Sequence, residues 1–374
     1  MKTPFLELLP TYRELQGELD AAYHRVMSSG WYLLGPELEA FESEFAAFCQ
    51  ARHAVGVGNG LDALHLVLRA YEIGPGDEVI VPAHTFIATW LAVSYAGATP
   101  VPVDVEPRFF NMDVSKVEAL ITPRTRAIMP VHLYGHPAEM EALMALAARH
   151  DLRVIEDAAQ AHGSRLHGVS AGALGHAAGF SFYPGKNLGA FSDAGAVVTN
   201  DDALAAKVRK LRNYGSAVKY QHDEPGINSR IDELTAAVLR VKLSHLPAWN
   251  RRRVAVAARY AEALRERSDL RLPQVAEGCE HAWHLYAVRH PQRDRLREWL
   301  QANDVGSLIH YPVPPHLAPA YRALGHRAGE FPEAEEIAKT VLSLPMGPHL
   351  SSEQVDHVIA ALRSYRASAW EETR

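Results

Sequence analysis

The chain has 374 residues, of which 48% are hydrophobic and 22% are charged, so it can bury sizeable hydrophobic cores. Single cores usually stop growing at roughly 250–300 residues, and we therefore expect two domains, a large one over residues 1–246 and a smaller one over residues 247–374. The formal net charge of −6 argues against a nucleic-acid-binding protein, because the basic face of such a protein normally gives net positive charge.

Cysteine content and hydrophobic patterning predict a soluble protein of the cytoplasm. Cys49 and Cys279 are too few and too far apart in the sequence for a disulfide scaffold or a zinc site, which favours a reducing compartment. No run approaches the ~18 apolar residues of a membrane span, and the amino end lacks the pattern of a cleaved leader. The 20 histidines are scattered. We expect no membrane contact and no bound metal.

Short apolar runs alternate with helical patterns over the first part of the chain, which predicts an α/β fold with a mainly parallel central sheet in the large domain. The predicted strands are residues 54–57, 78–81, 99–103, 127–131, 153–155, 178–182 and 195–199. A helix is predicted over residues 202–213. Another is predicted over residues 231–243, because apolar residues recur there at helical spacing.

The second domain is predicted to be a small α/β unit. Pro247 and the basic stretch 250–253 look like the start of a long helix that leads into it, with Arg251 to Arg253 on a solvated face rather than in a nucleotide site. Short strands near residues 285–289 and 307–309 follow, then a proline-rich turn and a last helix. Ser351 and Gln354 have the spacing of a capping box at the start of that helix.

A Gly-Asn-Gly turn joins a strand to a helix in G-V-G-N-G-L-D-A-L-H-L-V-L (56–68). Backbone N–H groups at a helix start can bind an anion with the help of the helix dipole, so Gly60 and Leu61 are candidate phosphate ligands. The turn is weak evidence alone, since many α/β proteins have one that binds nothing. Phe86, after the next strand, could stack on a bound ring, although core packing explains most aromatic residues at such positions.

The run V-I-E-D-A-A-Q-A-H-G (154–163) ends a buried strand with an acidic pair. A carboxylate at the carboxyl end of a parallel strand faces the crevice in which open α/β sheets bind ligands, which favours Asp157 as a site residue. Gln160 and His162 lie close by in the sequence and could hydrogen-bond a cofactor or a substrate. The competing interpretation is that Glu156 and Asp157 cap the following turn.

Lys186 lies close to two glycines in G-F-S-F-Y-P-G-K-N-L-G-A (179–190), shortly after an apolar strand. Partial burial lowers the pKa of a lysine amine, and the common use of such an amine is a Schiff base with a carbonyl cofactor. Pyridoxal 5'-phosphate is the candidate, because an aspartate such as Asp157 would keep its pyridinium nitrogen protonated. Ser181 could add a hydroxyl group to the phosphate site.

In this order the motifs resemble those of the DegT/DnrJ/StrS nucleotide-sugar aminotransferases, which are fold-type I pyridoxal-phosphate enzymes. The resemblance runs from about Gly30 to the carboxyl end, and its most specific motifs are G-N-G-L-D-A-L (58–64), E-D-A-A-Q-A-H-G (156–163), S-F-Y-P-G-K-N-L-G (181–189), R-N-Y-G (212–215), N-S-R-I-D-E (228–233) and H-Y-P (310–312). It implies transamination through Lys186, since relatives with histidine there dehydrate sugars. The residue matching Asn228 reaches the neighbouring subunit's cofactor in this family, which implies a homodimer with shared active sites.

The same resemblance assigns roles to the other site residues. Asp157 would pair with the pyridinium nitrogen, and Gln160 would contact the cofactor's phenolic oxygen. Gly60, Leu61 and Ser181 would bind the phosphate group.

The substrate side of the site is expected in the second domain and the loops. His310 and Tyr311 match residues that line the hexose pocket in relatives, and Tyr183, three residues before the lysine, could do the same. Lys219 and Tyr220 lie in a segment of mixed aromatic and basic residues, which suits a base and a diphosphate. A plain solvated connector is the equally weighted alternative for that segment.

Residues 56–66 and 85–93 most resemble the family branch that aminates carbon 3 of a dTDP-linked 3-keto-6-deoxyhexose with L-glutamate as donor. Amination of carbon 4 of a nucleotide-4-keto sugar is the nearest alternative. A non-catalytic pyridoxal-phosphate-binding regulatory protein has less support, because no DNA-binding segment precedes Gly30. An enzyme acting on an α-amino acid is also less favoured, since no arginine of the small domain stands out as a carboxylate ligand.

Overall fold

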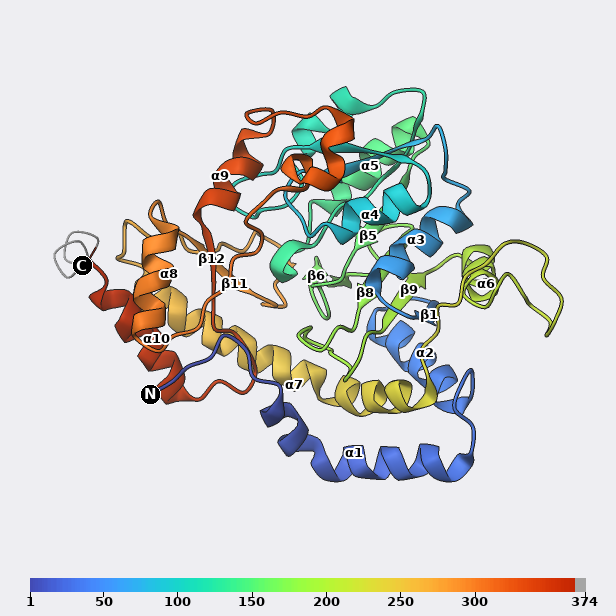
Figure 1. The fold of residues 1–374 in the computed structure, drawn as a ribbon, viewed down its shortest axis with the longest axis horizontal. Coiled ribbons are helices and arrows are strands. Elements are labelled where there is room, and N and C mark those ends of the chain that lie inside the picture. Colours follow the sequence, from blue (N-terminus) through green and yellow to red (C-terminus); the bar gives the residue numbers. More distant parts are fainter. Residues whose placement is uncertain (367–374) are drawn as a thin grey trace.

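The computed structural model describes residues 1–366, and its centre is a seven-stranded sheet in the order β1-β9-β8-β5-β4-β2-β3 (Figure 1). The strands are β1 (His53–Val57), β2 (Glu78–Pro82), β3 (Thr99–Val103), β4 (Thr125–Ile128), β5 (Arg153–Asp157), β8 (Ala177–Ser181) and β9 (Gly195–Thr199). Among them, β9 runs antiparallel to β1 and β8, and the other neighbours pair in parallel. The predicted α/β class and mainly parallel sheet are confirmed, although β4 ends at Ile128 rather than at residue 131.

Alternation along the strands gives the sheet two apolar faces. In β5, Ile155 faces a core shared with α3 (Gly60–Ala70), α4 (Ala88–Tyr95) and α6 (Asp202–Leu211). Val154 faces the opposite core, which is shared with α5 (Met140–His150). Because this alternation continues to the end of the strand, Glu156 and Asp157 leave β5 on opposite faces.

One helix, α7 (Glu233–Leu264), replaces the two helices predicted over residues 231–243 and from Pro247 onward. The expected helix start at Pro247 is wrong, because this proline lies inside α7. An interior proline loses a backbone hydrogen bond and costs about 3 kcal/mol. Burial of Leu246 and Trp249 on either side of it offsets that cost. The domain division at residue 247 falls within this helix and stays a proposal.

The basic stretch of α7 is only partly solvated, which corrects its expected exposure. Arg251 and Arg252 are exposed, but Arg253 is buried, since three residues in a row cannot all lie on one face of a helix. The first half of α7 packs in a core with α2 (Pro36–Phe48), and its last turns pack in a separate C-terminal core. α7 therefore connects the two parts of the molecule (Figure 1).

The C-terminal core contains the antiparallel pair β11 (Tyr286–Arg289) and β12 (Val341–Leu344) with α8 (Arg293–Ala302) and α10 (Ser352–Ser364). The predicted strand over residues 307–309 is wrong, because Leu308 makes only an isolated bridge there, with Ser343. Sequence reasoning missed β12 because it follows α9 (Pro332–Thr340) without a break and its apolar residues extend the helical pattern. The capping box of Ser351 and Gln354 is confirmed.

The N-terminal segment lies against the C-terminal part of the chain. Thr3 exchanges backbone hydrogen bonds with Asp304 and Gly306, and α1 (Leu9–Ser29) then runs beside α7 (Figure 1). The remaining strands, β6 (Arg165–Leu166), β7 (Val169–Ser170) and β10 (Cys279–Glu280), form a small separate sheet. Within residues 1–366, none of the helices combines the length and the apolar character that crossing a membrane requires.

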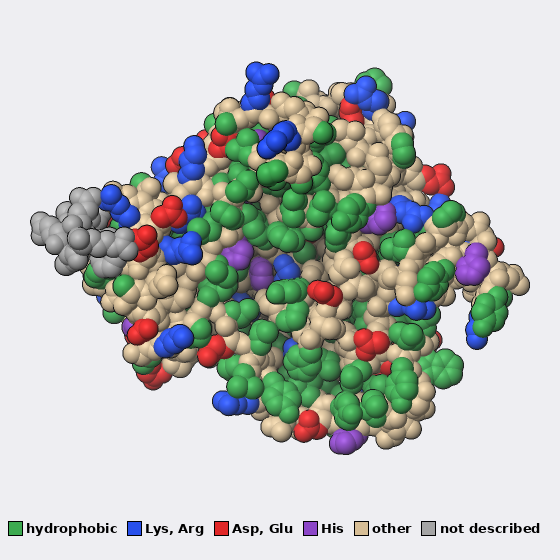
Figure 2. Space-filling model, viewed as in Figure 1, with side chains coloured by type: hydrophobic (Ala, Val, Ile, Leu, Met, Phe, Trp, Pro, Cys, Tyr) green, Lys and Arg blue, Asp and Glu red, His purple; other side chains and the backbone are tan. Residues whose placement is uncertain are grey.

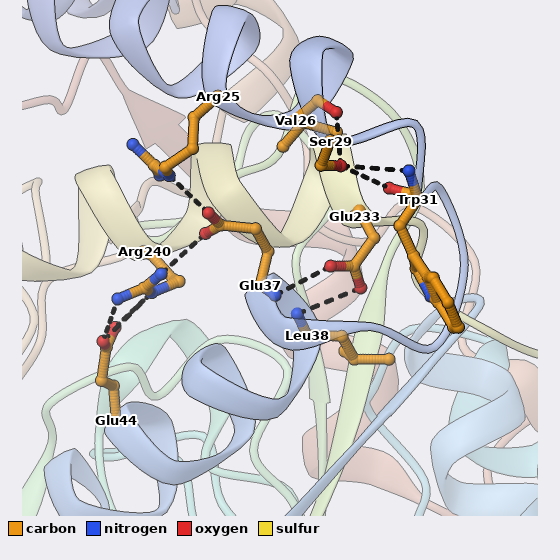
Figure 3. Close-up of polar contacts among 9 residues, drawn as sticks. All are labelled: Arg25, Val26, Ser29, Trp31, Glu37, Leu38, Glu44, Glu233 and Arg240. Carbon is orange, nitrogen blue, oxygen red and sulfur yellow. Dashed lines mark hydrogen bonds and ion pairs between the residues drawn. The ribbon is translucent and has the colours of Figure 1, made fainter.

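A buried carboxylate, Glu233, ties the start of α7 to the start of α2 (Figure 3). Its two oxygens accept hydrogen bonds from the backbone N–H groups of Gly35 (2.8 Å), Glu37 (2.8 Å) and Leu38 (3.2 Å). No side chain at the N-cap position of α2 caps these groups. The last residue of the N-S-R-I-D-E motif therefore has a structural role, since it caps a helix that lies far away in the sequence.

Glu233→Ala should lower the free energy of unfolding by about 2–4 kcal/mol, because buried N–H groups would lose a charged acceptor. Glu44→Ala is the matched control, since the partly exposed Glu44 carboxylate pairs with Arg240 at the surface and such pairs contribute about 0–1 kcal/mol. Urea unfolding followed by circular dichroism measures both changes. Equal losses in the two variants would contradict the capping role.

Candidate active site

Asp157 ends β5 at the carboxyl edge of the sheet, and its side chain is buried beside α4. Its Oδ2 accepts a hydrogen bond from the Thr89 hydroxyl (2.8 Å), and its Oδ1 accepts one from the N–H of Ala159 (3.2 Å). Burial raises the pKa of this carboxyl group, and the Thr89 hydrogen bond opposes the rise. No cation within residues 1–366 forms an ion pair with Asp157, so a protonated ring nitrogen would supply the missing positive charge.

Glu156, its neighbour, points to the other face of the sheet and holds a loop. Its carboxylate accepts hydrogen bonds from the N–H groups of Gly172 (2.8 Å) and Gly175 (2.7 Å), and it lies 2.8 Å from Nε2 of His132. Turn capping, the competing interpretation of the acidic pair, therefore does not describe Glu156. The pair has two separate roles, and only Asp157 faces the site.

Lys186 lies in the loop after β8, in a turn closed by a hydrogen bond from its own N–H to the Tyr183 carbonyl (2.8 Å). Asn187 fixes the loop by donating its side-chain amide to the Ala282 carbonyl (2.8 Å). Burial lowers the pKa of the Lys186 amine to about 8, and Asp157 opposes the shift. An ordinary lysine has a pKa near 10.4, so this amine is far more available as a neutral nucleophile near pH 8.

The Gly-Asn-Gly turn and Ser181 form one corner of the site. The Asn59 side chain caps α3 by accepting the Asp62 N–H (2.8 Å), and the first N–H groups of α3, at Gly60 and Leu61, have no partner within the helix. A Cβ at position 60 would lie 2.7 Å from Cβ of Ser181, so only glycine lets the turn approach β8 so closely. The helix dipole and the Ser181 hydroxyl suit a phosphate group.

Gln160 connects the segment after β5 to the C-terminal part of the chain. Its Oε1 accepts the N–H of Tyr134 (2.6 Å), and its Nε2 donates to the hydroxyl of Tyr311 (3.0 Å). Because the amide nitrogen carries two hydrogens, one is left for a phenolic oxygen of a cofactor. The Tyr311 ring lies 5.3 Å from the ring of Phe86, which places both aromatic residues at the site.

Two histidines near Lys186 are uncharged at neutral pH. Burial, reinforced by the Lys186 cation, lowers the pKa of His310 to about 4, and Nδ1 of His310 lies 2.9 Å from Oγ of Ser343. The same causes hold the pKa of His284 well below its ordinary value, and its Nδ1 lies 3.2 Å from Oδ1 of Asn187. Both rings can hydrogen-bond a substrate without adding a charge.

Sequence reasoning missed Thr89, Tyr134 and His284. Thr89 comes from α4, Tyr134 follows β4, and His284 precedes β11, so the fold brings together residues from segments that lie far apart in the sequence. No local motif signals their roles. For Thr89, the one available signal is its place in the run T-F-I-A-T-W that also contains Phe86.

His162 is buried, and it lies close enough to Lys186 for the lysine charge to help lower its pKa. Its ring is fully buried between Phe180 and Phe182, with ring centroids 5.3 Å and 5.7 Å away, and burial lowers its pKa to about 3. Contact with a substrate would require this core to repack. The expected substrate contact of His162 stays a prediction.

Asn228 is exposed, and its segment lies against the phosphate turn of its own chain. Oγ of neighbouring Ser229 accepts the Gly58 N–H (2.8 Å) and donates to Asp62 (2.6 Å). The sequence distance between Asn228 and the other motifs therefore does not separate it from its own site. Its expected contact with the partner's cofactor rests on the family resemblance and needs an experiment.

Tyr183, Lys219 and Tyr220 are exposed. The Lys219 amine lies 5.1 Å from the centre of the Tyr220 ring, and both residues are on the loop that projects beyond α6 (Figure 1). Within residues 1–366 no hydrogen bond joins these three side chains to Lys186 or Asp157. Their expected substrate contacts stay predictions.

A buried lysine amine of lowered pKa and a buried carboxylate, at the carboxyl edge of a mainly parallel sheet, are the groups that an enzyme using pyridoxal phosphate requires. A model of the DegT/DnrJ/EryC1/StrS aminotransferase family matches residues 13–363, and the chain belongs to that family. It is 56% identical to a dTDP-3-amino-3,4,6-trideoxy-alpha-D-glucose transaminase of Streptomyces venezuelae, over 97% of this chain and 96% of that protein. It is 57% identical to the erythromycin biosynthesis sensory transduction protein EryC1 of Saccharopolyspora erythraea, over 97% of this chain and 100% of that protein.

Solved structures agree with this assignment. The crystal structure of S. venezuelae DesV in complex with a ketimine intermediate superposes with a TM-score of 0.95, at 57% identity, over 97% of this chain and 98% of that chain. NtdA of Bacillus subtilis with bound cofactor PMP superposes with a TM-score of 0.90, at 31% identity, over 97% of this chain and 84% of that chain. The chain is an aminotransferase whose cofactor is pyridoxal phosphate.

Proposed function

We propose that this chain transfers an amino group from L-glutamate to carbon 3 of a dTDP-linked 3-keto-6-deoxyhexose. The observation that carries the proposal is the full-length similarity to a dTDP-3-amino-sugar transaminase together with the lysine and carboxylate of the site. When bound, the cofactor supplies an electron sink for the carbon that exchanges its amino group. Amination at carbon 4 is the nearest alternative within the same chemistry.

Each residue of the site has a separate role in this proposal. The Lys186 amine would hold the cofactor and would also serve as the base that moves a proton between carbons, since its pKa of about 8 leaves it partly neutral near pH 8. Asp157 keeps the ring nitrogen protonated. Gly60, Leu61 and Ser181 hold the phosphate, and Gln160 orients the ring through its phenolic oxygen.

We place the hexose against Tyr311, His310 and Tyr183. Tyr311 already meets Gln160 and Phe86, and the uncharged ring of His310 suits hydrogen bonds to sugar hydroxyls. Lys219 and Tyr220 would meet the diphosphate and the base on the exposed loop. Phe86 would stack on the cofactor ring.

The test is to incubate the enzyme with L-glutamate and either the 3-keto or the 4-keto dTDP sugar, and to identify the products by NMR. We expect an amino sugar from the 3-keto compound with nitrogen at carbon 3. The position in which the site binds the ketone carbon decides the outcome, because a displacement of about 1 Å from the attack position can cost ~100-fold in rate. Product from the 4-keto compound alone would overturn the carbon 3 assignment and leave the aminotransferase class intact.

A regulatory role is the second candidate, and the name of the EryC1 relative is the observation that favours it. A regulator would keep the cofactor site but need no turnover. Repeated turnover of the keto sugar with stoichiometric conversion of glutamate would exclude a purely regulatory protein. Cofactor binding with no turnover on either keto sugar would favour it.

We also propose that the active unit is a homodimer, in the cytoplasm. Figure 2 shows apolar side chains gathered over much of one face of the molecule. Exposed aromatic residues of the chain include Trp31, Tyr32, Phe86, Tyr183 and Phe191. Large exposed apolar areas mark protein interfaces. Both cysteines are free thiols, which agrees with a reducing compartment.

Mixing two inactive variants tests the shared site. If Asn228 serves the partner's cofactor, a heterodimer of Lys186→Ala and Asn228→Ala chains contains one intact site. Equal mixing with free exchange should then restore about one quarter of wild-type activity, since half of the dimers are mixed and each has one working site of two. No recovered activity, with exchange confirmed by mass spectrometry, would place Asn228 in its own chain's site.

A further inference from the structure

A small cavity next to Lys186 is lined by two further cations, Lys242 and Arg253 of α7. The N-terminal residues 4–8 and the loop residues 346–350 also line it. Its volume is about 60 Å³, several times the ~10–15 Å³ that one water molecule needs. It has room for a small anionic group such as a carboxylate.

Both cations are buried, and their hydrogen bonds go to backbone carbonyls. Nζ of Lys242 donates to the Gly189 carbonyl (2.5 Å) and lies 4.3 Å from the centre of the Phe191 ring. Nη1 of Arg253 donates to the carbonyls of Trp283 (3.1 Å) and His284 (3.4 Å). Burial lowers the pKa of Lys242 to about 8 and that of Arg253 to about 10. Both groups are held in place but lack a counter-charge.

No carboxylate within residues 1–366 forms an ion pair with either cation. Glu7, the acidic residue among those lining the cavity, is exposed. Buried cations are costly when unpaired, and Arg253 makes its contacts through Nη1, which leaves Nη2 and Nε for a planar anion. A carboxylate entering the cavity would pair with both side chains and remove that cost.

We propose that Lys242 and Arg253 bind a carboxylate group of the amino donor in this cavity beside Lys186. This inference rests on the proposed function, because it assumes that an amino acid gives up its nitrogen at this site. An α-amino acid has its carboxylate and its amine on the same carbon, so a carboxylate held in a cavity that Lys186 also lines brings the amine to the reacting centre. The small volume favours a carboxylate over the larger diphosphate of a nucleotide sugar.

The experiment compares the wild-type holoenzyme with Lys242→Gln and Arg253→Lys. Calorimetric titration with glutarate, an unreactive dicarboxylate, reports donor binding without turnover, and titration with dTDP reports the nucleotide site. Single-turnover measurements then give the dependence of the first half-reaction on glutamate and of the second on keto sugar. Lys207→Gln and Arg259→Lys are matched controls, because these surface residues pair with Glu72 and Asp356 away from the cavity.

We expect each cavity variant to weaken glutarate binding and to raise the half-saturating glutamate concentration by about 10–100-fold, as expected for the loss of a charge-assisted hydrogen bond. The dissociation constant of dTDP and the half-saturating concentration of keto sugar should each change by less than about 3-fold. If Arg253→Lys does not fold, the results for Lys242→Gln alone test the donor site.

Unchanged glutarate affinity in the cavity variants, or weaker binding of dTDP alone, would overturn the donor site. Amino transfer by the wild type would still support the proposed function in that case. Failure of the wild type to transfer nitrogen from any amino acid would instead refute the proposed function itself. An equal loss in both half-reactions would also overturn the donor site, because a general defect of the fold gives that pattern.

Discussion

Lys186→Ala should stop amino transfer, with kcat at least ~10⁴-fold below that of the wild type. In the proposed function one amine both holds the cofactor and moves the proton between carbons, and removal of a positioned acid–base group alone costs about 10²–10⁴-fold. The wild-type protein as isolated should be yellow, and in the variant the cofactor should be absent or only weakly held. Steady-state rates with the preferred keto sugar and the absorption spectrum measure both effects.

Lys207→Ala is the control for this substitution, since Lys207 lies on α6 and pairs with Glu72 on the protein surface. It should keep the rate and the spectrum of the wild type. Near-normal turnover by Lys186→Ala would refute the assignment of the whole site. Spectral loss in the Lys207 variant would show that the spectrum reports something other than Lys186.

Asp157→Asn should lower kcat/KM by about 10²–10³-fold, corresponding to roughly 2.7–4 kcal/mol of transition-state stabilisation. Asparagine has nearly the same shape: its amide oxygen can accept the Ala159 N–H, and its amide nitrogen can donate to the Thr89 hydroxyl, which can donate to Thr85 in turn. It cannot balance the charge of a protonated ring nitrogen. The substitution therefore removes the charge while it preserves the packing. Rates at saturating cofactor separate weak cofactor binding from slow chemistry.

The effect of Asp157→Asn on the melting temperature should depend on whether the cofactor is bound. Because burial raises the pKa of Asp157, its ionised form destabilises the cofactor-free fold at pH values above that raised pKa. The cofactor-free variant should therefore melt at the same temperature as the wild type or higher. The rise in melting temperature on adding cofactor should be smaller in the variant. A lower melting temperature without cofactor would contradict this account.

The centre of the site could be predicted because its residues lie at the ends of strands. Asp157 ends β5, the turn at Gly60 follows β1, and the carboxyl ends of parallel strands meet at one edge of a sheet. Lys186 follows β8, the neighbour of β5. A local pattern together with one rule of topology was enough to bring these three segments together.

The second layer of the site could not be predicted in this way. Thr89, Tyr134 and His284 have ordinary neighbours in the sequence, and only tertiary packing gives them their hydrogen bonds. For His162, closeness to Asp157 in the sequence did not predict the surroundings of the ring. It lies close to Asp157 in the sequence, but the chain turns after Asp157 and buries the imidazole between two phenylalanine rings.

Errors in the fold have similar causes. Pro247 suggested a helix boundary, yet buried neighbours outweigh the local cost of a proline within α7. Arg253 was expected on a solvated face with Arg251, although a helix turns by about 100° at each residue and points them in different directions. That error concealed the cation on which the proposed donor site depends.

The most direct test of the central claim is to locate the cofactor on the chain. Borohydride reduction of the isolated holoenzyme fixes the carbon–nitrogen double bond, and peptide mapping by mass spectrometry then identifies the modified lysine. We predict one modified residue, Lys186, and no loss of the label when an exposed lysine such as Lys207 is replaced. A label on any other lysine, or on none, would contradict the account.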